Sequence, residues 1–147
     1  SNGPGDPTEM QPYLADIKEI TTAYPTLGIC LGHQIIALAY GGKTEKLLFG
    51  HRGANQPVAD KKNHTVFMTS QNHSYVVNEE SINHTELEVR FTQVNDGTIE
   101  GLQHATLPII STQFHPEANP GPAESNIVFD EFLQNVKSTS GREKVYA

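Results

Sequence analysis

The sequence predicts an α/β protein in which short buried strands alternate with amphipathic helices. A short apolar strand at residues 26–29 turns at once into a helix over 31–39, and a second, mostly apolar strand covers 107–114. Helical periodicity is present near both ends of the chain. Strands buried on both faces read as apolar runs, and such burial is typical of sheets covered by helices.

Length and composition are those of one folded domain. The chain has 147 residues, and single domains most often have about 100–150. Charged residues make up 18%, which excludes a disordered polyelectrolyte, and the net charge of −7 argues against a nucleic-acid-binding surface. The single cysteine excludes an internal disulfide, and no apolar run reaches the ~18 residues of a membrane span. We expect a cytoplasmic protein, although the chain opens with neither Met nor a signal peptide.

The first part of the chain is expected to alternate helix, strand and helix. Residues 1–7 hold two glycines and two prolines, which predicts a tight loop, with Asp6 or Thr8 as a candidate helix cap. Apolar residues at spacings of three and four then predict a helix that ends before Pro25; they are Met10, Tyr13, Leu14, Ile17 and Ile20. The helix after the first strand is expected to stop at the Gly41-Gly42 pair.

The middle of the chain reads as short β-runs, and the end as a helix. The runs cover residues 66–69, 75–77, 87–91 and 98–102, and Asn95-Asp-Gly97 predicts a hairpin between the last two. A last helix is expected to open at Ser125 or Asn126, with an apolar face. Its inward residues are expected to be Ile127, Val128, Phe129, Phe132, Leu133 and Val136. We expect residues 1–137 to form the domain and 138–147 a polar C-terminal tail.

The segment Gly28-Ile-Cys-Leu-Gly32 matches a nucleophile elbow, with cysteine in place of serine. A strand that turns at once into a helix strains the backbone of its nucleophile, and the flanking glycines avoid collision. Cys30 would lie at a helix N-terminus, where the helix dipole and free amides favour thiolate, and the Leu31 amide could bind an oxyanion. A lone cysteine is more often a small core residue, so the flanking strand and helix carry the catalytic prediction.

A base for this thiol is expected among the seven histidines, and His115 is the strongest candidate. It ends the second buried strand, and Pro116 favours an extended conformation before it. Residues i and i+2 of an extended chain point the same way, so Glu117 can orient the imidazole. His33 is a weaker candidate, because it lies on the helix that follows Cys30. The three predicted catalytic side chains would meet at the carboxyl ends of two strands, where open α/β sheets place their sites.

Two other sequence patterns are weaker indications of a functional site. The glycine-rich loop over residues 2–6 could offer a backbone amide to an oxyanion or to a substrate carboxylate. It lacks the residues of a phosphate-binding loop, so no nucleotide is expected there. His64, His73 and His84 have no ligand spacing and there is no second cysteine, so no metal site is expected.

Taken together, the motifs resemble the class I (triad-type) glutamine amidotransferases. The resemblance rests on three motifs in order, Asn2-Gly-Pro-Gly5, Gly28-Ile-Cys-Leu-Gly-His-Gln34 and His115-Pro-Glu117, and covers residues 1 to about 136. Narrower motifs are similar to the small-subunit family of glutamine-hydrolysing carbamoyl-phosphate synthases. They are Phe49-Gly-His-Arg-Gly53, Ser70-Gln-Asn-His73, Asp96-Gly-Thr-Ile-Glu-Gly101 and His115-Pro-Glu-Ala-Asn-Pro-Gly-Pro122.

The resemblance implies a chemistry for the matched residues. Cys30 would attack the carboxamide carbon of glutamine and form a γ-glutamyl thioester, His115 would transfer the proton, and Glu117 would orient His115. Gly5 and Leu31 would donate amides to the oxyanion. By matched position the substrate-binding residues are Gly3, Gly5, Leu31, Gln34, Asn72, Ser74 and Tyr75, although the family more often has Gly and Phe at the last two.

The resemblance also implies a fold and a partner. The fold would be a flavodoxin-like class I glutamine amidotransferase sheet with flanking helices and extra β-hairpins. Several β–α units precede the Asn-Gly-Pro-Gly loop in that family, so residues 1–137 are expected to be a partial glutaminase domain with little activity alone. Ammonia would pass to a large carbamoyl-phosphate synthase subunit, which uses ATP, Mg and bicarbonate for pyrimidine and arginine synthesis, and no cofactor is expected in this chain.

Two alternatives stay open from the sequence. The chain could instead be the amidotransferase portion of another synthase, of the GMP or anthranilate type, or a γ-glutamyl hydrolase. It could also be a non-catalytic interaction module or inactive fragment that keeps the fold without an assembled site. Co-purification with a large synthetase subunit distinguishes the first alternative, and labelling of Cys30 by a glutamine-like electrophile distinguishes the second.

Overall fold

Strand β6 (Ile109–Thr112) lies inside a mixed six-stranded sheet, which explains why all of its residues are buried. The computed structural model describes residues 6–118 and 126–146. On one side β6 pairs in parallel with β1 (Thr26–Ile29), and on the other it pairs antiparallel with β5 (Ile99–His104). The strand order is β1-β6-β5-β4-β2-β3, with every pair except β1–β6 antiparallel.

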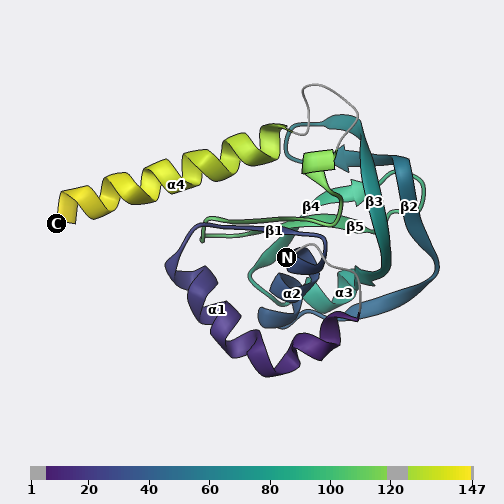
Figure 1. The fold of residues 1–147 in the computed structure, drawn as a ribbon, viewed down its shortest axis with the longest axis horizontal. Helices are drawn as coiled ribbons and strands as arrows, with labels where there is room; N and C mark the ends of the chain where they lie inside the picture. Colours follow the sequence, from purple (N-terminus) through teal and green to yellow (C-terminus); the bar gives the residue numbers. More distant parts are fainter. Residues whose placement is uncertain (1–5, 119–125, 147) are drawn as a thin grey trace.

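Helices cover both faces of the β1–β6 pair, which confirms the predicted α/β class. Figure 1 shows α1 (Leu14–Ala23) and α2 (Leu31–Ala39) on one side of β1, and α4 (Asn126–Tyr146) on the other. The chain enters α1 through a 3-10 turn, η1 (Pro7–Tyr13), which Asp6 caps by accepting a hydrogen bond from the Thr8 amide. Pro12 has no N–H to donate, which accounts for the delay of the regular helix.

The two faces of the sheet carry separate apolar cores. Neighbouring residues of β6 point in opposite directions, so Ile109 packs with α2 and Ile110 packs toward α4. The second core is built around three phenylalanine rings that meet edge to face at 5.4–6.1 Å. These rings belong to Phe67, Phe91 and Phe114, and Val128 of α4 packs against them.

A long antiparallel ribbon, formed by β2 (Thr44–Asp60) and β3 (Thr65–Val77), is the largest departure from the sequence prediction. The sequence predicts no strand at 44–60 and two short runs instead of β3. The register of the pair shifts twice, between Lys46 and His51 and between Gly53 and Gln56. Such irregularities break the period of two by which a strand is recognised, and the ribbon leaves Leu48 90% exposed.

The other predicted strands and turns are confirmed with shifted ends. Strand β4 (Leu87–Gln93) and β5 flank the predicted hairpin, whose Gly97 has a φ of 74°. The helix α2 stops where Gly41 adopts a φ of 98°. Two short elements complete the fold, α3 (Glu79–Ile82) and the 3-10 turn η2 (Pro116–Ala118).

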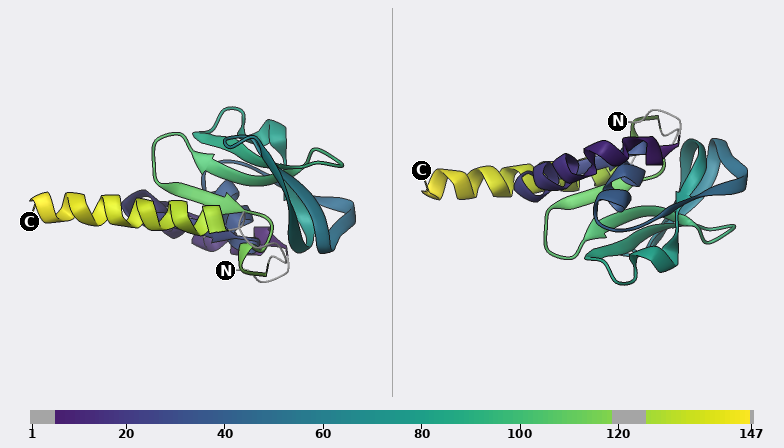
Figure 2. Two further views of the ribbon diagram at one scale, coloured as in Figure 1. Left: turned by 90° about the horizontal axis from the view of Figure 1, so that it is seen from above. Right: turned by 90° about the horizontal axis from the view of Figure 1, so that it is seen from below.

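Helix α4 begins at Asn126 as predicted but buries less of its apolar face than predicted. Val128 is buried and Leu133 is 52% exposed, which is a correction to its predicted inward position. The reason is visible in Figure 2, where the helix projects away from the body of the sheet. The helix also continues through residues 138–146, where the sequence predicts a polar tail.

Candidate active site

Cys30 stands at the junction of β1 and α2 in the strained conformation that the motif predicts. Its φ of 54° and ψ of −106° lie in a region that side chains rarely adopt. Its N–H donates to Thr112 O at 2.8 Å, so the parallel ladder with β6 continues to this residue. The thiol therefore sits at the carboxyl edge of the parallel pair, directly before the first turn of α2.

Gly28 is required by the close approach of α2 to the strand. A Cβ at this position would lie 2.5 Å from Ile36 Cδ1 and 2.9 Å from the backbone of Gly32. The elbow brings its two glycines into backbone contact, as the sequence pattern predicts. The helix can approach the strand this closely because position 28 has no side chain.

The Cys30 thiol is buried and receives a hydrogen bond from a residue that the sequence analysis did not select. Gln113 Nε2 lies 3.7 Å from Cys30 Sγ, and Gln113 Oε1 accepts from Gln34 Nε2 at 2.9 Å. The same Gln34 nitrogen donates to Tyr75 O at 2.9 Å. Gln113 directly follows β6, and the register pairing of Ile29 with Thr112 places it beside Cys30. The feature of the sequence that could have pointed to Gln113 is its position directly after a buried strand that pairs with the elbow strand.

Burial raises the pKa of the Cys30 thiol, which corrects the expectation that the helix terminus makes it a ready thiolate. The Leu31 amide and Gln113 act in the opposite direction by donating hydrogen bonds to the sulfur. The negative charges of Glu117 and Glu100 raise the pKa further. The thiol is therefore held protonated, and a nucleophilic reaction requires a base that removes its proton.

His115 and Glu117 form the pair that the sequence predicts. His115 Nδ1 lies 2.9 Å from Glu117 Oε1, and the His115 amide donates to Ser70 O at 3.0 Å. The pair follows the end of β6, at the sheet edge where β1 delivers Cys30. Among the described residues, the side-chain hydrogen bond to Cys30 Sγ comes from Gln113, and His115 lies at the same sheet edge without a hydrogen bond to the thiol.

The predicted substrate-binding residues divide into two groups in the structure. Leu31 and Gln34 lie on α2, and the Tyr75 carbonyl joins them through Gln34. Asn72 is exposed and Ser74 is half-buried, and both flank the buried His73, so they face the other side of β3. Gly3 and Gly5 lie outside the described residues.

The surroundings of His33 make it unsuitable as the catalytic base. Its side chain is fully buried, and Nδ1 lies 2.7 Å from Ser111 Oγ on β6. Burial lowers the pKa of His33 to about 3, with a further contribution from nearby His73. It is a neutral core histidine.

Comparison with known proteins agrees with the resemblance found in the motifs. A family model described as "Glutamine amidotransferase class-I" matches residues 1–135. The chain is 67% identical over 136 residues to the carbamoyl phosphate synthase arginine-specific small chain of Bacillus subtilis, covering 92% of this chain and 38% of that protein. It is 56% identical over 147 residues to the protein of that name in Halalkalibacterium halodurans, covering 100% of this chain and 41% of that protein. The chain thus spans about two fifths of the length of these relatives.

Solved structures support the fold. A Thermoplasma acidophilum protein described as a candidate GMP synthase component superposes with a TM-score of 0.80 at 23% identity, over 97% of this chain and 73% of that one. A glutamine amidotransferase from Thermotoga maritima superposes with a TM-score of 0.63 at 17% identity, over 98% and 63%. Within residues 6–118 and 126–146, no helix is long and apolar enough to cross a membrane.

Proposed function

The chain belongs to the glutamine amidotransferase class-I family, and from this premise we propose that it hydrolyses the carboxamide of glutamine to supply ammonia for carbamoyl phosphate synthesis. The name shared by the relatives from Bacillus subtilis and Halalkalibacterium halodurans supports the second half of the proposal. The observation that carries the first half is a buried cysteine at positive φ beside a histidine–carboxylate pair on the same sheet edge.

The reaction uses Cys30 as the nucleophile. Its sulfur bonds to the carboxamide carbon of glutamine, while the thiol proton passes to His115. The tetrahedral intermediate then collapses, the C–N bond breaks, and the proton from His115 leaves with the nitrogen as ammonia. Water attacks the resulting thioester with His115 again as the base, which gives glutamate and restores the thiol.

His115 is the proposed base because a thiol of raised pKa does not ionise unaided at neutral pH. The 2.9 Å contact with Glu117 holds Nδ1, and this leaves Nε2 to exchange a proton with the sulfur. We expect the imidazole to reach the thiol when glutamine binds, since catalytic hydrogen bonds are often loose before substrate binds.

We assign the glutamine contacts by matched position. The Leu31 amide, together with Gly5, stabilises the oxyanion. Gln34 and Tyr75 shape the pocket next to the sulfur, because Gln34 Nε2 already binds the Tyr75 carbonyl and Gln113. The remaining assigned contacts are Gly3, Asn72 and Ser74.

The proposed partner is a large synthetase subunit, because the relatives are named as small chains. Ammonia released at Cys30 passes to that subunit, which binds ATP and Mg and uses bicarbonate. The product serves arginine synthesis, as the relatives' arginine-specific name indicates. The resemblance to the carbamoyl-phosphate synthase family adds pyrimidine synthesis to the proposal. The proposed location of this reaction is the cytoplasm.

Labelling with a glutamine-like electrophile tests the proposal directly. We expect modification at Cys30, suppression of the modification by glutamine but not by the shorter amide asparagine, and no labelling of Cys30→Ser. Ammonia release from glutamine is then measured with the large subunit present, where the same substitution abolishes turnover. Labelling that glutamine leaves unchanged would overturn the assignment of this site to glutamine.

A further inference from the structure

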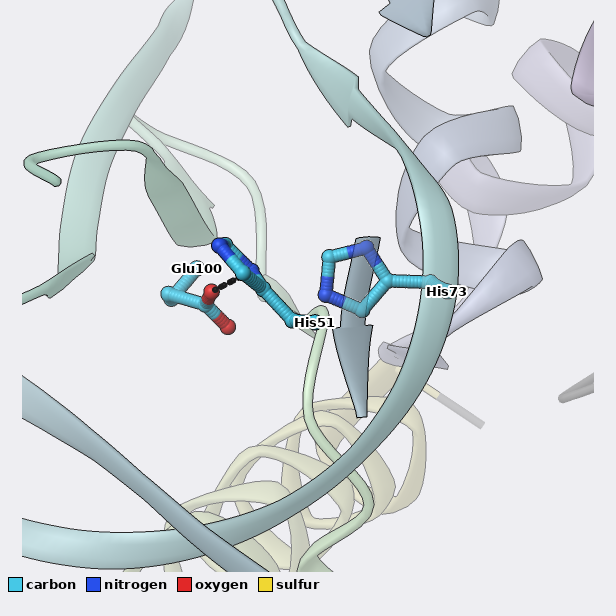
Figure 3. Close-up of side chains that lie close together, drawn as sticks. All are labelled: His51, His73 and Glu100. Atoms are coloured by element: carbon cyan, nitrogen blue, oxygen red, sulfur yellow. Dashed lines mark ion pairs between the residues drawn. The ribbon is translucent and has the colours of Figure 1, made fainter. Parts of the chain in front are cut away.

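Three buried polar side chains outside the Cys30 site gather inside the curl of the sheet (Figure 3). His51 comes from β2, His73 from β3 and Glu100 from β5, and one ligand atom of each lies within 4.8 Å of the others. His51 and His73 are 7% exposed, and Glu100 is fully buried. The rings of the two histidines meet edge to face at 5.0 Å.

Several atoms of this cluster lack the partners that buried polar groups normally have. Neither carboxylate oxygen of Glu100 has a hydrogen-bond partner among the described residues, and His51 Nδ1 has none either. His51 Nδ1 lies 3.3 Å from Glu100 Oε1, which is ion-pair distance without hydrogen-bond alignment. Buried polar atoms are paired in the great majority of cases, so these three atoms indicate a missing ligand.

A chain of hydrogen bonds that ends at His73 also contains one contact in which neither atom has a proton to donate. Thr69 Oγ1 donates to Gln56 O at 2.7 Å, and Gln71 Nε2 donates to Thr69 Oγ1 at 3.0 Å. Gln71 Oε1 lies 2.7 Å from His73 Nε2, and Tyr75 O lies 2.9 Å from His73 Nδ1. Both ring nitrogens therefore face oxygen, whereas a neutral imidazole has one N–H. If the Gln71 amide is turned over, its nitrogen can donate to His73 Nε2. Gln71 Oε1 then faces Thr69 Oγ1, whose proton is already donated to Gln56 O.

The tautomer of His73 follows from its contacts. The Tyr75 carbonyl can only accept a hydrogen bond, so His73 Nδ1 carries the one proton of the neutral ring and donates it there. This leaves the Nε2 lone pair directed toward Glu100 and His51, where a metal cation can satisfy it.

The outer contacts of both histidines match those of metal ligands. Histidines that bind metals almost always donate their other N–H to a carboxylate or a backbone carbonyl, which fixes the tautomer and the ring. His51 Nε2 lies 2.7 Å from Asp96 Oδ2, and His73 Nδ1 lies 2.9 Å from Tyr75 O. The inner nitrogens, His51 Nδ1 and His73 Nε2, are thereby turned toward Glu100.

We propose that His51 Nδ1, His73 Nε2 and the Glu100 carboxylate bind a divalent transition metal of the zinc class. Zinc accepts imidazole and carboxylate ligands at about 2.0–2.2 Å, which separates ligand atoms by about 3.3 Å in a tetrahedron. The distance between His51 Nδ1 and Glu100 Oε1 is already 3.3 Å. Small side-chain rotations would bring the other ligand atoms, which lie within 4.8 Å of one another, to the same separation. Gln71 Oε1 or a water takes the fourth position, and the partly exposed Asp96 marks the route of access.

The metal would stabilise structure and would not touch the substrate. It would join β2, β3 and β5, of which β3 and β5 are not neighbours in the sheet. The Tyr75 carbonyl, which His73 Nδ1 contacts, also accepts from Gln34 in the Cys30 site. Loss of the metal would loosen this carbonyl, but binding of the metal itself does not depend on the reaction assigned to Cys30.

A buried ion pair is the competing explanation. The close contacts of His51 with the carboxylates of Glu100 and Asp96 raise the pKa of His51 to about 9. A protonated His51 beside an ionised Glu100 would then fill the cluster without metal. This arrangement leaves His73 Nε2 facing an acceptor, which is why we favour the metal.

Zinc titration of tag-free, chelator-treated protein tests the proposal. We expect one Zn²⁺ per chain by calorimetry, and a Co²⁺ derivative with the intense visible bands of a four-coordinate site. Glu100→Gln keeps the shape and removes the charge, and should weaken Zn²⁺ binding more than 100-fold, since even outer-contact changes cost about 10–100-fold. Asp96→Asn lies at the partly exposed end, and should weaken binding within that 10–100-fold range.

Glu86→Gln provides the matched control. Glu86 pairs with His104 at 2.9 Å in a histidine–glutamate contact outside the cluster, so this variant should bind Zn²⁺ as the unsubstituted protein does. Circular dichroism on each variant separates lost binding from lost folding, and Asp96→Asn remains informative if Glu100→Gln does not fold. No Zn²⁺ binding, or equal binding by Glu100→Gln and Asp96→Asn, overturns the proposal and leaves the buried ion pair.

Discussion

The elbow at Cys30 and the cluster of His51, His73 and Glu100 are both buried, but the chain builds them in opposite ways. Five consecutive residues, Gly28 to Gly32, set the geometry of the elbow, because the strand, the turn and the helix are local. The cluster draws one residue from each of three strands and exists only after β2, β3 and β5 have found their register. Local chemistry can be recognised from a short motif, whereas chemistry assembled across a sheet requires the tertiary fold.

The largest expected effect isolates the elbow as the reactive region. Cys30→Ser should lower glutamine-dependent ammonia release at least about 10³-fold, because a serine hydroxyl is much less acidic than a thiol and His115 cannot ionise it to the same extent. The free energy of unfolding should change by less than about 1 kcal/mol, since one buried atom is exchanged for a smaller one. Urea titration and an ammonia assay check the two parts, and residual turnover above about one per cent contradicts the assignment.

The next effect separates the base from its orienting carboxylate. Glu117→Gln should lower kcat about 10²-fold, a magnitude typical of general acid–base assistance, while the KM for glutamine changes little. The reason is that a neutral amide in place of the carboxylate cannot stabilise the imidazolium that forms when His115 takes the thiol proton. A steady-state assay over pH 6–9 measures kcat and KM separately. A rise in KM with unchanged kcat would instead place Glu117 in substrate binding.

Substituting glycines compares a packed position with an open one. Gly28→Ala should destabilise the fold by about 1–3 kcal/mol, because its Cβ meets Ile36 Cδ1 at 2.5 Å and Gly32 at 2.9 Å. Gly97→Ala has nothing within 4 Å and meets only the strain of a φ of 74°, about 1–2 kcal/mol. Urea midpoints measure both, and only Gly28→Ala should also lower activity. Equal losses of activity would show that the elbow does not depend on this contact.

The last expected effect is a pH dependence of stability on the acid side. His33 and His73 have pKa values lowered by burial to about 3 and about 4, so their contribution to stability is present above the unfolded pKa of about 6.5. This stabilising contribution is lost as the pH falls from about 6.5 toward the pKa values that the histidines have in the folded protein, at up to about 1.4 kcal/mol per pH unit for each histidine. Urea unfolding in chelator between pH 4.5 and 7 measures the slope. His33→Gln should reduce it, and an unchanged slope would assign the dependence to other groups.

Sequence reasoning reached the features that depend on neighbours along the chain. It predicted β1, α2, the hairpin at Gly97 and the contact between Gly28 and Gly32, since each follows from a few consecutive residues. It missed β2, because two register shifts break the alternation of the strand. It placed Leu133 inward, because the periodicity of a helix does not show how far the sheet beneath it extends.

The candidate site divides in the same way. The contact of His115 with Glu117 is predicted from their spacing and is present at 2.9 Å, but it forms at the 3-10 turn η2 and not in the extended segment that the sequence predicts. The contact of Gln113 with the sulfur depends on the pairing of β1 with β6, and the raised pKa of Cys30 depends on how deeply the fold buries it. Partners across strands and burial are properties of the whole fold, so no local motif reports them.

Because of its positive φ, the position of Cys30 is under two opposed selective pressures, one for stability and one for chemistry. Glycine adopts this backbone conformation without strain, which for other residues costs about 1–3 kcal/mol. Random mutation screened only for thermostability should therefore accept glycine here more readily than at other buried positions. Retention of cysteine at this residue in variants screened also for glutamine hydrolysis would then record selection for chemistry against the preference of the backbone.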